Sequence, residues 1–165
     1  MEQKMRRFKQ QLAIDDAVKI LDNCTNGILS LVDTDGAPYG VPISYVYDGH
    51  NHLYLHCAAS GRKIGCIKAD SRCSFCVVSQ DSIVPEEFTT YFRSVIVTGK
   101  IKILTDSEEI RHGLILLSDK YCPGIDPTKE IDTFINTVKV LRIDIDSITG
   151  KESIELVRQR QQSNS

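Results

Sequence analysis

The chain has 165 residues, of which 41% are hydrophobic and 25% are charged, and its formal net charge is -2 at pH 7. These values are typical of one globular domain with its own core, and they give no electrostatic reason to expect a nucleic acid or a membrane surface as a partner. The N-terminus lacks the apolar core of a signal peptide, and no apolar run approaches the roughly 20 residues of a membrane span. We therefore expect a cytoplasmic protein.

The first part of the chain predicts a helix and a strand. Residues 1–11 are basic and polar, and we expect a poorly ordered arm or one that packs on a partner subunit. Apolar residues then recur at helical spacing from Ile14 to Leu21, which predicts a first helix over residues 14–23. Residues 27–32 predict a strand, and Asp33-Thr-Asp-Gly-Ala-Pro38 predicts the turn that follows it.

Residues 39–63 read YGVPISYVYDGHNHLYLHCAASGRK and predict a β-hairpin. From residue 40 to residue 47 the side chains alternate, with Val41, Ile43, Tyr45 and Tyr47 on one face, as in a strand. Asp48-Gly-His-Asn51 supplies turn chemistry, and the run from Leu53 to Ala58 is the second strand.

A short helix is expected after the hairpin, with Ser60 as its N-cap and with Arg62 and Lys63 in its first turn. Two cations at this position oppose the helix dipole, which is already positive at the N-terminus. The arrangement is favourable if an anion binds there, because free N–H groups, a guanidinium and an ammonium together form a phosphate site. The alternative is that both charges are simply solvated.

Strands dominate the rest of the chain, which predicts a mainly β fold. We expect, in order, a strand over 73–79, a loop over 80–88, a long strand over 89–104, a helix over 106–118, a shorter helix over 129–137 and a strand over 138–146. Gly99 predicts a bulge or sharp bend in the long strand. Six strands in hairpin order predict an antiparallel sheet that closes into a barrel with flanking helices. We expect a single domain with its core at about residues 13–152 and a flexible tail at 158–165.

The six cysteines include one C-x-x-C pair, Cys73 and Cys76. This spacing occurs in metal sites, but on the predicted strand the two side chains would point to opposite faces, and no second pair exists. We therefore expect small apolar core residues and no metal site.

Several motifs follow one another along the chain: Val-Pro-Ile-Ser-Tyr in a strand, a hairpin, a strand ending Leu-Tyr-Leu-His-Cys-Ala, then Ser-Gly-Arg-Lys-Ile, and later Tyr-Phe-Arg-Ser-Val-Ile-Val-Thr-Gly. In this order and spacing they resemble the pyridoxamine 5′-phosphate oxidase-like flavoproteins. Within that family the chain is most similar to the nitroimidazole-resistance branch, whose members are often labelled nitroimidazole reductases. The resemblance covers about residues 13–152.

The resemblance implies a six-stranded antiparallel split barrel that forms a homodimer and binds FMN in each of two clefts at the subunit interface. The edge of the strand from Val41 to Tyr45 would lie along the isoalloxazine, largely through backbone groups, and Arg62 with Lys63 would hold the phosphate. The implied cofactor-binding residues are Val41, Pro42, Ile43, Ser44, Tyr45, His56, Cys57, Ala58, Arg62, Lys63, Tyr91, Arg93 and Ser94, the last three from the same chain or from the partner.

His56 is the candidate catalytic residue. Members of the nitroimidazole-resistance branch have a histidine at the matching position, beside the flavin and associated with the substrate pocket. An imidazole with a pKa of about 6.5 can give a proton to a reduced nitro group or orient a substrate. The alternative is a histidine bonded to a backbone carbonyl at the end of a strand. We expect no function for His50, His52 and His112.

Three functions are consistent with these residues. The first is an FMN-dependent oxidoreductase that takes electrons from a reduced nicotinamide or another donor and reduces a small molecule such as a nitroimidazole or another nitroaromatic. The second is a non-catalytic binding module for flavin or haem. The third is pyridoxamine 5′-phosphate oxidation itself, for which Arg158 and Arg160 are the only candidates to hold a second phosphate.

Overall fold

The structure, a computed structural model, describes residues 5–163. Its strands are β1 (Asn26–Val32), β2 (Pro38–Ser44), β3 (Val46–Tyr47), β4 (His52–Ala58), β5 (Arg72–Val84), β6 (Thr89–Ile103) and β7 (Val138–Glu152). Its helices are α1 (Ile14–Asn23), α2 (Arg62–Ala69), α3 (Ser107–Tyr121), α4 (Thr128–Phe134) and α5 (Ile154–Ser163), with 3-10 turns η1 (Phe8–Gln10) and η2 (Pro85–Glu87).

The described strands form one antiparallel sheet of seven, in the order β2-β1-β5-β6-β7-β4-β3. The two edge strands are separated in the chain by Tyr45 alone, so the sheet must curl until its edges meet at that residue. This arrangement confirms the mainly β antiparallel barrel. The strand count is seven rather than six because the strand expected over residues 40–47 breaks at Tyr45.

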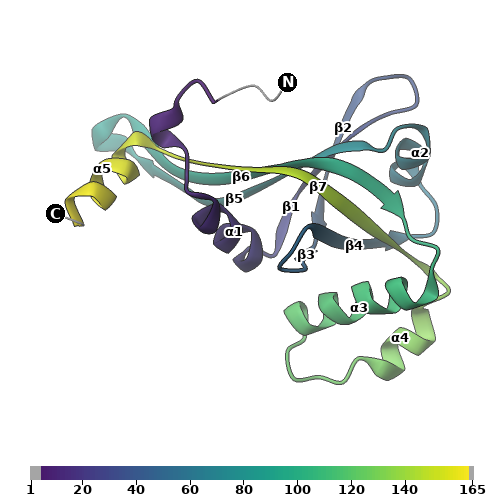
Figure 1. The fold of residues 1–165 in the computed structure, drawn as a ribbon. Helices are drawn as coiled ribbons and strands as arrows, with labels where there is room; N and C mark the ends of the chain where they lie inside the picture. The colour runs from purple at the N-terminus through teal and green to yellow at the C-terminus, as the bar shows by residue number, and fades with distance from the viewer. Residues whose placement is uncertain (1–4, 164–165) are drawn as a thin grey trace.

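β5, β6 and the end of β7 extend beyond the barrel as an arm (Figure 1). The loop expected over residues 80–88 is wrong for its first half, because β5 stays paired with β6 as far as Val84 and Thr89. The turn begins only at Pro85, where η2 starts, and it closes at Phe88, whose φ is 51°.

Gly99 lies at a register shift between β6 and β7, which confirms the predicted bulge. A β-carbon at this position would lie 2.2 Å from the backbone oxygen of Asp144. Since that atom belongs to the paired strand, it has no room to move away. The close approach of the two backbones therefore requires glycine here.

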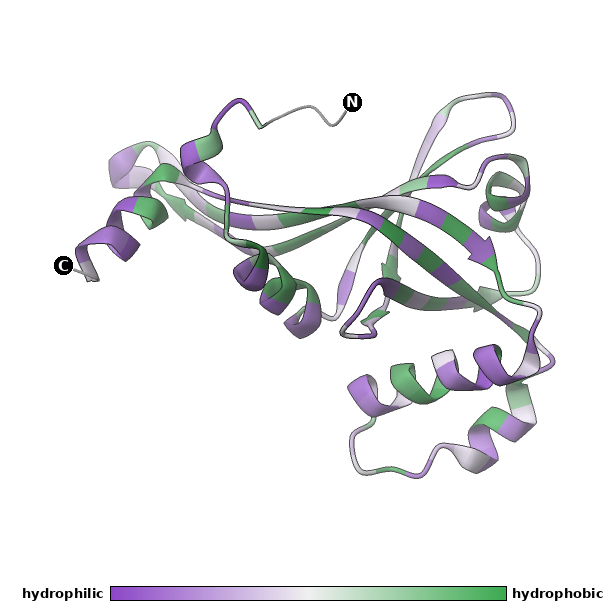
Figure 2. Ribbon diagram, in the orientation of Figure 1, coloured by the Kyte–Doolittle hydropathy of each residue, from purple (hydrophilic) through white to green (hydrophobic). Residues whose placement is uncertain are grey.

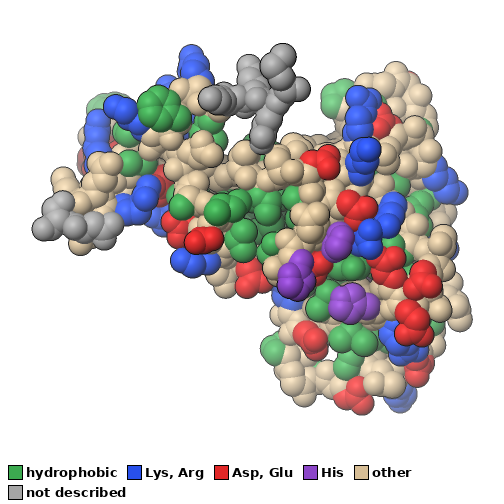
Figure 3. Space-filling model, in the orientation of Figure 1, with side chains coloured by type: hydrophobic (Ala, Val, Ile, Leu, Met, Phe, Trp, Pro, Cys, Tyr) green, Lys and Arg blue, Asp and Glu red, His purple; other side chains and the backbone are tan. Residues whose placement is uncertain are grey.

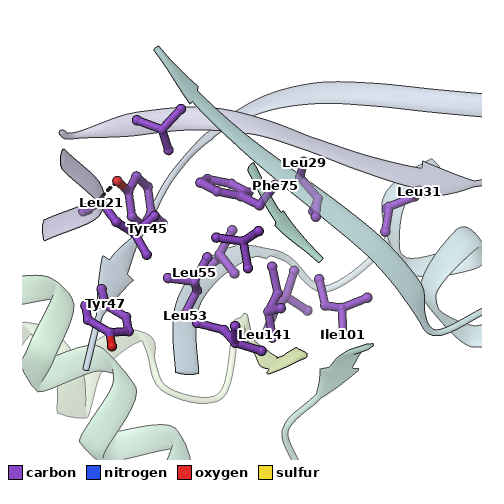
Figure 4. Close-up of a cluster of buried hydrophobic side chains, with 14 of the residues drawn as sticks. Leu21, Leu29, Leu31, Tyr45, Tyr47, Leu53, Leu55, Phe75, Ile101 and Leu141 are labelled. Carbon is purple, nitrogen blue, oxygen red and sulfur yellow. Dashed lines mark hydrogen bonds between the residues drawn. The ribbon is translucent and has the colours of Figure 1, made fainter. Parts of the chain in front are cut away.

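The barrel interior is filled by apolar side chains from every long strand, among them Leu29, Leu55, Phe75 and Leu141 (Figure 4). Outward positions are mostly polar, and Figure 2 shows hydrophobic and hydrophilic residues alternating along β7. Tyr45 is 0% exposed and its hydroxyl donates a hydrogen bond to the backbone carbonyl of Leu21 on α1. Burial raises the pKa of this tyrosine, so it stays protonated.

The remaining helices lie outside the barrel. The N-terminus of α3 is capped as predicted, because the side chain of Asp106 accepts a hydrogen bond from the backbone N–H of Glu109. α3 packs on the sheet through Leu117, which joins Tyr54 and Val140 in a second apolar cluster. α4 lies beside α3, on the side away from the barrel (Figure 1).

The two ends of the chain carry short elements. Gln10 is buried in η1, and Gln11 forms a bridge to Lys151 of β7. Residues 158–163 continue α5. The expected flexibility of the two ends, and the packing of the first arm on a partner subunit, stay predictions. Residues 1–4, 164 and 165 lie outside the described residues. Between residues 5 and 163 there is no helix with the length and apolar character required to cross a membrane.

Candidate functional site

Two strand edges that lack a neighbouring strand flank the opening of the barrel. Among residues 5–163, β2 pairs only with β1, and the second half of β4 pairs only with β7 because β3 reaches no further than Tyr54. Two cavities are each lined by both strands. The smaller one is lined by Tyr39 and Cys57, and the larger one by Ser44 and His56. We call this region the β2–β4 split.

The predicted residues on β2 alternate as expected. Val41 and Ile43 are half-buried against the core, whereas Pro42 and Ser44 are exposed. Tyr45 continues the alternation, because its side chain is in the barrel interior like those of Val41 and Ile43, but its backbone leaves the ladder. Its N–H donates to the hydroxyl of Tyr121 over 3.0 Å, so the end of α3 supplies the partner that a neighbouring strand would otherwise give.

The smaller cavity, of about 220 Å³, is cationic. Arg62 and Lys63 line it together with Tyr39, and Cys57 and Ala58 contribute from the end of β4. Burial raises the pKa of the Cys57 thiol, and the positive charge of Lys63 opposes this shift. The structure thus brings four of the predicted residues into one small space.

Arg62 is held in place by two contacts that the sequence did not reveal. Its Nε donates to Oδ2 of Asp33 over 2.6 Å, and its guanidinium lies 4.4 Å from the centre of the Tyr39 ring. The backbone N–H of Thr34, followed by the Arg62 side chain, lowers the pKa of Asp33, so this carboxylate stays ionised. Among the described residues the terminal nitrogens of Arg62 have no hydrogen-bond partner.

The first turn of α2 presents free donors to the same cavity. Gly61 is the N-cap, with a φ of 127° and no side-chain cap, so the expectation that Ser60 caps the helix is wrong. The helix bonds begin with the N–H groups of Ile64 and Gly65, which both donate to the carbonyl of Gly61. The N–H groups of Arg62 and Lys63 therefore have no partner within the helix, as expected at an N-terminus.

The larger cavity, of about 420 Å³, lies between the split and the helices α3 and α4. Its walls are mostly apolar and come from Leu114, Leu117, Ile131, Phe134, Ile135 and Val138. Ser44 and His56 line it from the strands, and Glu130 lines it from α4. The imidazole of His56 has no hydrogen-bond partner within residues 5–163, so the ring is free to contact a ligand. The expected alternative, a bond to a backbone carbonyl, does not occur.

The end of α3 fixes this cavity against the barrel. The hydroxyl of Tyr121 donates to a backbone carbonyl, that of Thr25 or that of Tyr45, the latter 2.8 Å away. The neighbouring Lys120 donates to the carbonyl of Cys24 over 2.6 Å, and burial lowers its pKa. These bonds attach the end of α3 to Tyr45, at which the sheet edges meet, and to the segment between α1 and β1.

The other three predicted residues lie elsewhere in the single chain. Tyr91 donates a hydrogen bond to Glu87 at the tip of the arm. Arg93 pairs with the buried Glu152, with 3.1 Å between Nε and Oε2. Ser94 is the next residue along β6. None of the three lines either cavity of the split among the described residues.

The outward side of the sheet has a broad area without charge. Register places Pro42, Ile28, Cys76, Ile96 and Thr149 side by side across five strands. The adjacent row holds Gly40, Ser30, Ser74, Thr98 and Ser147. We call these two rows the outer face. In Figure 3, in contrast, acidic and basic side chains are interspersed over the barrel, on the right of the view.

Comparison with known proteins shows which family model the chain matches. A family model described as pyridoxamine 5′-phosphate oxidase matches residues 14–152. Comparison with curated proteins finds no match.

Solved structures with the same fold come from several bacteria. The chain is 24% identical to a Bacteroides thetaiotaomicron protein named for a proposed role in 5-nitroimidazole antibiotic resistance, with 86% of each chain covered and a TM-score of 0.74. It is 26% identical to a FAD-binding protein from Mesorhizobium loti, with 87% of this chain and 97% of that chain covered and a TM-score of 0.65. It is 21% identical to a FAD and haem binding protein from Mycobacterium smegmatis, with 88% and 73% covered and a TM-score of 0.72.

Proposed function

Because this chain belongs to the pyridoxamine 5′-phosphate oxidase family, we propose that it is an FMN-dependent oxidoreductase that reduces a small molecule such as a nitroaromatic. The observation that carries the proposal is the β2–β4 split, which has a cationic cavity at one end and an apolar cavity at the other. FMN would place its phosphate in the smaller cavity and its ring system along the edge of β2, which leaves the larger cavity at the far end of the split for the substrate.

The residues of the smaller cavity fit a phosphate. Two cations line it, and two helix N–H groups lack partners within the helix. Charge-assisted bonds of this kind are among the stronger polar contacts in proteins. Asp33 orients the guanidinium of Arg62 without using its terminal nitrogens, which match the oxygens of a phosphate. The edge of β2 would then face the isoalloxazine ring of FMN. Pro42 has no N–H group, which fits a strand whose outer edge meets a ligand rather than another strand.

We further propose a homodimer in which the outer face is the contact surface. Charged residues are depleted at the centres of protein interfaces, and the outer face has none across two rows of five strands. Ile96, which lies on β6 within this face, is 45% exposed although it is large and apolar. In such a dimer Tyr91, Arg93 and Ser94 would approach the cofactor from the partner subunit.

Bound flavin would supply the redox chemistry, by passing electrons from a reduced nicotinamide or another donor to the substrate. The residues of this chain would bind, orient and protonate. His56 is the candidate for proton donation, because its imidazole is exposed, lacks a partner among the described residues and lines the larger cavity. The cytoplasmic location stays a prediction.

The experiment is to purify the protein, remove any bound cofactor, and titrate it with FMN while recording absorbance and flavin fluorescence. We expect stoichiometric FMN binding, followed by oxidation of NADH or NADPH when a nitroimidazole is added. A colourless protein that binds no FMN would refute the proposal. His56→Ala, assayed at saturating FMN, should lose turnover, whereas His50→Ala, in the hairpin turn, should keep both turnover and FMN affinity.

A second candidate is a flavin-binding module without catalysis, which is favoured by the structural similarity to a protein named for FAD and haem binding. FMN binding without turnover for any donor and acceptor pair would support it. Pyridoxamine 5′-phosphate oxidation is less favoured, because Arg160 is paired with Glu152 over 2.7 Å rather than free to hold a second phosphate.

The dimer has its own test. Ile96→Lys should shift the protein from dimer to monomer in analytical ultracentrifugation and weaken FMN binding. Ile115→Lys is the matched control, because Ile115 is 39% exposed on α3, away from the outer face. An Ile96→Lys variant that remains dimeric would place the interface elsewhere.

A further inference from the structure

The two cavities of the β2–β4 split have opposite charge. The smaller one is lined by Arg62 and Lys63. The larger one has a single carboxylate, that of Glu130 on α4, and no lysine or arginine lines it among the described residues. A negative group is therefore favoured at one end of the split and a positive group at the other.

The shape of the larger cavity indicates an aromatic ligand. Its volume of about 420 Å³ falls within the range of small-molecule sites, roughly 300–1,000 Å³. Leu114 and Phe134 give it apolar walls from two helices, while Ser44 and His56 offer hydrogen bonds from the strands. A flat ring would contact the walls and exchange hydrogen bonds with the strand residues. A basic group on that ring would interact favourably with Glu130.

We propose that this larger cavity binds a small aromatic ring that carries a basic group, and that Glu130 selects it against an acidic ring of the same shape. The inference rests on the proposed function, in which the substrate lies at the end of the split away from the cofactor phosphate. It has a consequence for the substrate class. A ring that bears a phosphate or a carboxylate is disfavoured here, because of the two cavities only the smaller one is lined by arginine and lysine.

The charge preference is tested with two probes that the flavin has no means of reducing, benzylammonium and benzoate. Isothermal titration calorimetry on the FMN-loaded protein should give benzylammonium an affinity about fivefold higher than that of benzoate, the size expected for an exposed ion pair. Glu130→Gln should remove most of this preference and Glu130→Lys should reverse it. Equal or tighter binding of benzoate by the unmodified protein would overturn the proposal.

The location is tested by filling the cavity. Ser118→Phe places a ring in it from α3 and should weaken both probes by about tenfold or more. Ile115→Phe is the matched control on the exposed side of the same helix and should leave both affinities unchanged. Ile135→Phe repeats the filling from beside α4, in case Ser118→Phe fails to fold. Unchanged affinities in a folded filling variant would overturn the assignment.

Failure of this inference is distinguishable from failure of the proposed function. FMN affinity is measured separately, by quenching of flavin fluorescence, and the probe titrations are repeated on the protein without flavin. A protein that binds no FMN but prefers benzylammonium would refute the proposed function and retain the cavity assignment. A protein that binds FMN and shows no preference would refute the assignment alone.

Discussion

Replacing Arg62 and Lys63 together by alanine removes both cations from the smaller cavity. A hydrogen bond to a charged group contributes about 1.5–3 kcal/mol, and since the Arg62 side chain is 58% exposed we take the lower value for each. The loss of about 3 kcal/mol corresponds to a dissociation constant for FMN roughly a hundredfold higher. Asp33, left without its partner, adds repulsion of the phosphate in the same direction.

The assay is a titration of cofactor-free protein with FMN and, in parallel, with riboflavin, which lacks the phosphate. The double variant should lose FMN affinity and keep its affinity for riboflavin. Lys68→Ala combined with Lys100→Ala is the matched control, because it removes two exposed cations that line neither cavity. Equal losses for both ligands, or unchanged FMN binding, would show that the phosphate is not held by these residues.

Three other predictions concern stability and reactivity. Gly99→Ala should lower the free energy of unfolding by about 1–3 kcal/mol in urea, because the added carbon overlaps a facing carbonyl. Tyr121→Phe should lower it by about 1 kcal/mol, because the backbone N–H of Tyr45 loses its acceptor. Burial raises the pKa of Cys73 to about 12. At pH 8 iodoacetamide should therefore modify the exposed Cys122 far faster than Cys73, which mass spectrometry can follow. Modification of Cys73 should accelerate only as the pH rises towards 12.

Each of these has a control or a contradicting result. Gly65→Ala, in α2 with no atom within 4 Å of the added carbon, should leave stability unchanged or raise it, so an equal loss at both glycines would refute the steric argument. Tyr91→Phe removes a hydroxyl bonded only at the arm tip and should have a smaller effect than Tyr121→Phe. Modification of Cys73 as fast as Cys122 at pH 8 would contradict its burial.

Features set by local chemistry were predictable from the sequence. The hairpin turn formed as expected because Gly49 takes a φ of 80° and Asp48 accepts hydrogen bonds from the N–H groups of His50 and His52. The bulge at Gly99 was predictable for the same reason, since glycine within a run of β-branched residues marks a special backbone position. The hairpin order of the strands predicted a barrel, and the family resemblance implied that this barrel is split.

Features that depend on distant contacts were not predictable. Arg62 and Asp33 are 29 residues apart, and no local pattern links them. Tyr121 and Tyr45 are 76 apart, so nothing in the sequence signalled that α3 closes one side of the larger cavity. Residues 80–88, which include Pro85, Glu86 and Glu87, were expected to form a loop, but pairing with β6 holds residues 80–84 in a strand.

The position of β7 in the sheet has a consequence for synthesis of the protein. It is the last of the described strands to leave the ribosome, yet it lies between β6 and β4. A nascent chain that ends before Val138 can therefore assemble β2, β1, β5 and β6, while the β3–β4 ribbon has no neighbour to join. Both walls of the split come together only after β7 has emerged, and until then the open edges of β4 and β6 are available to chaperones or to other chains.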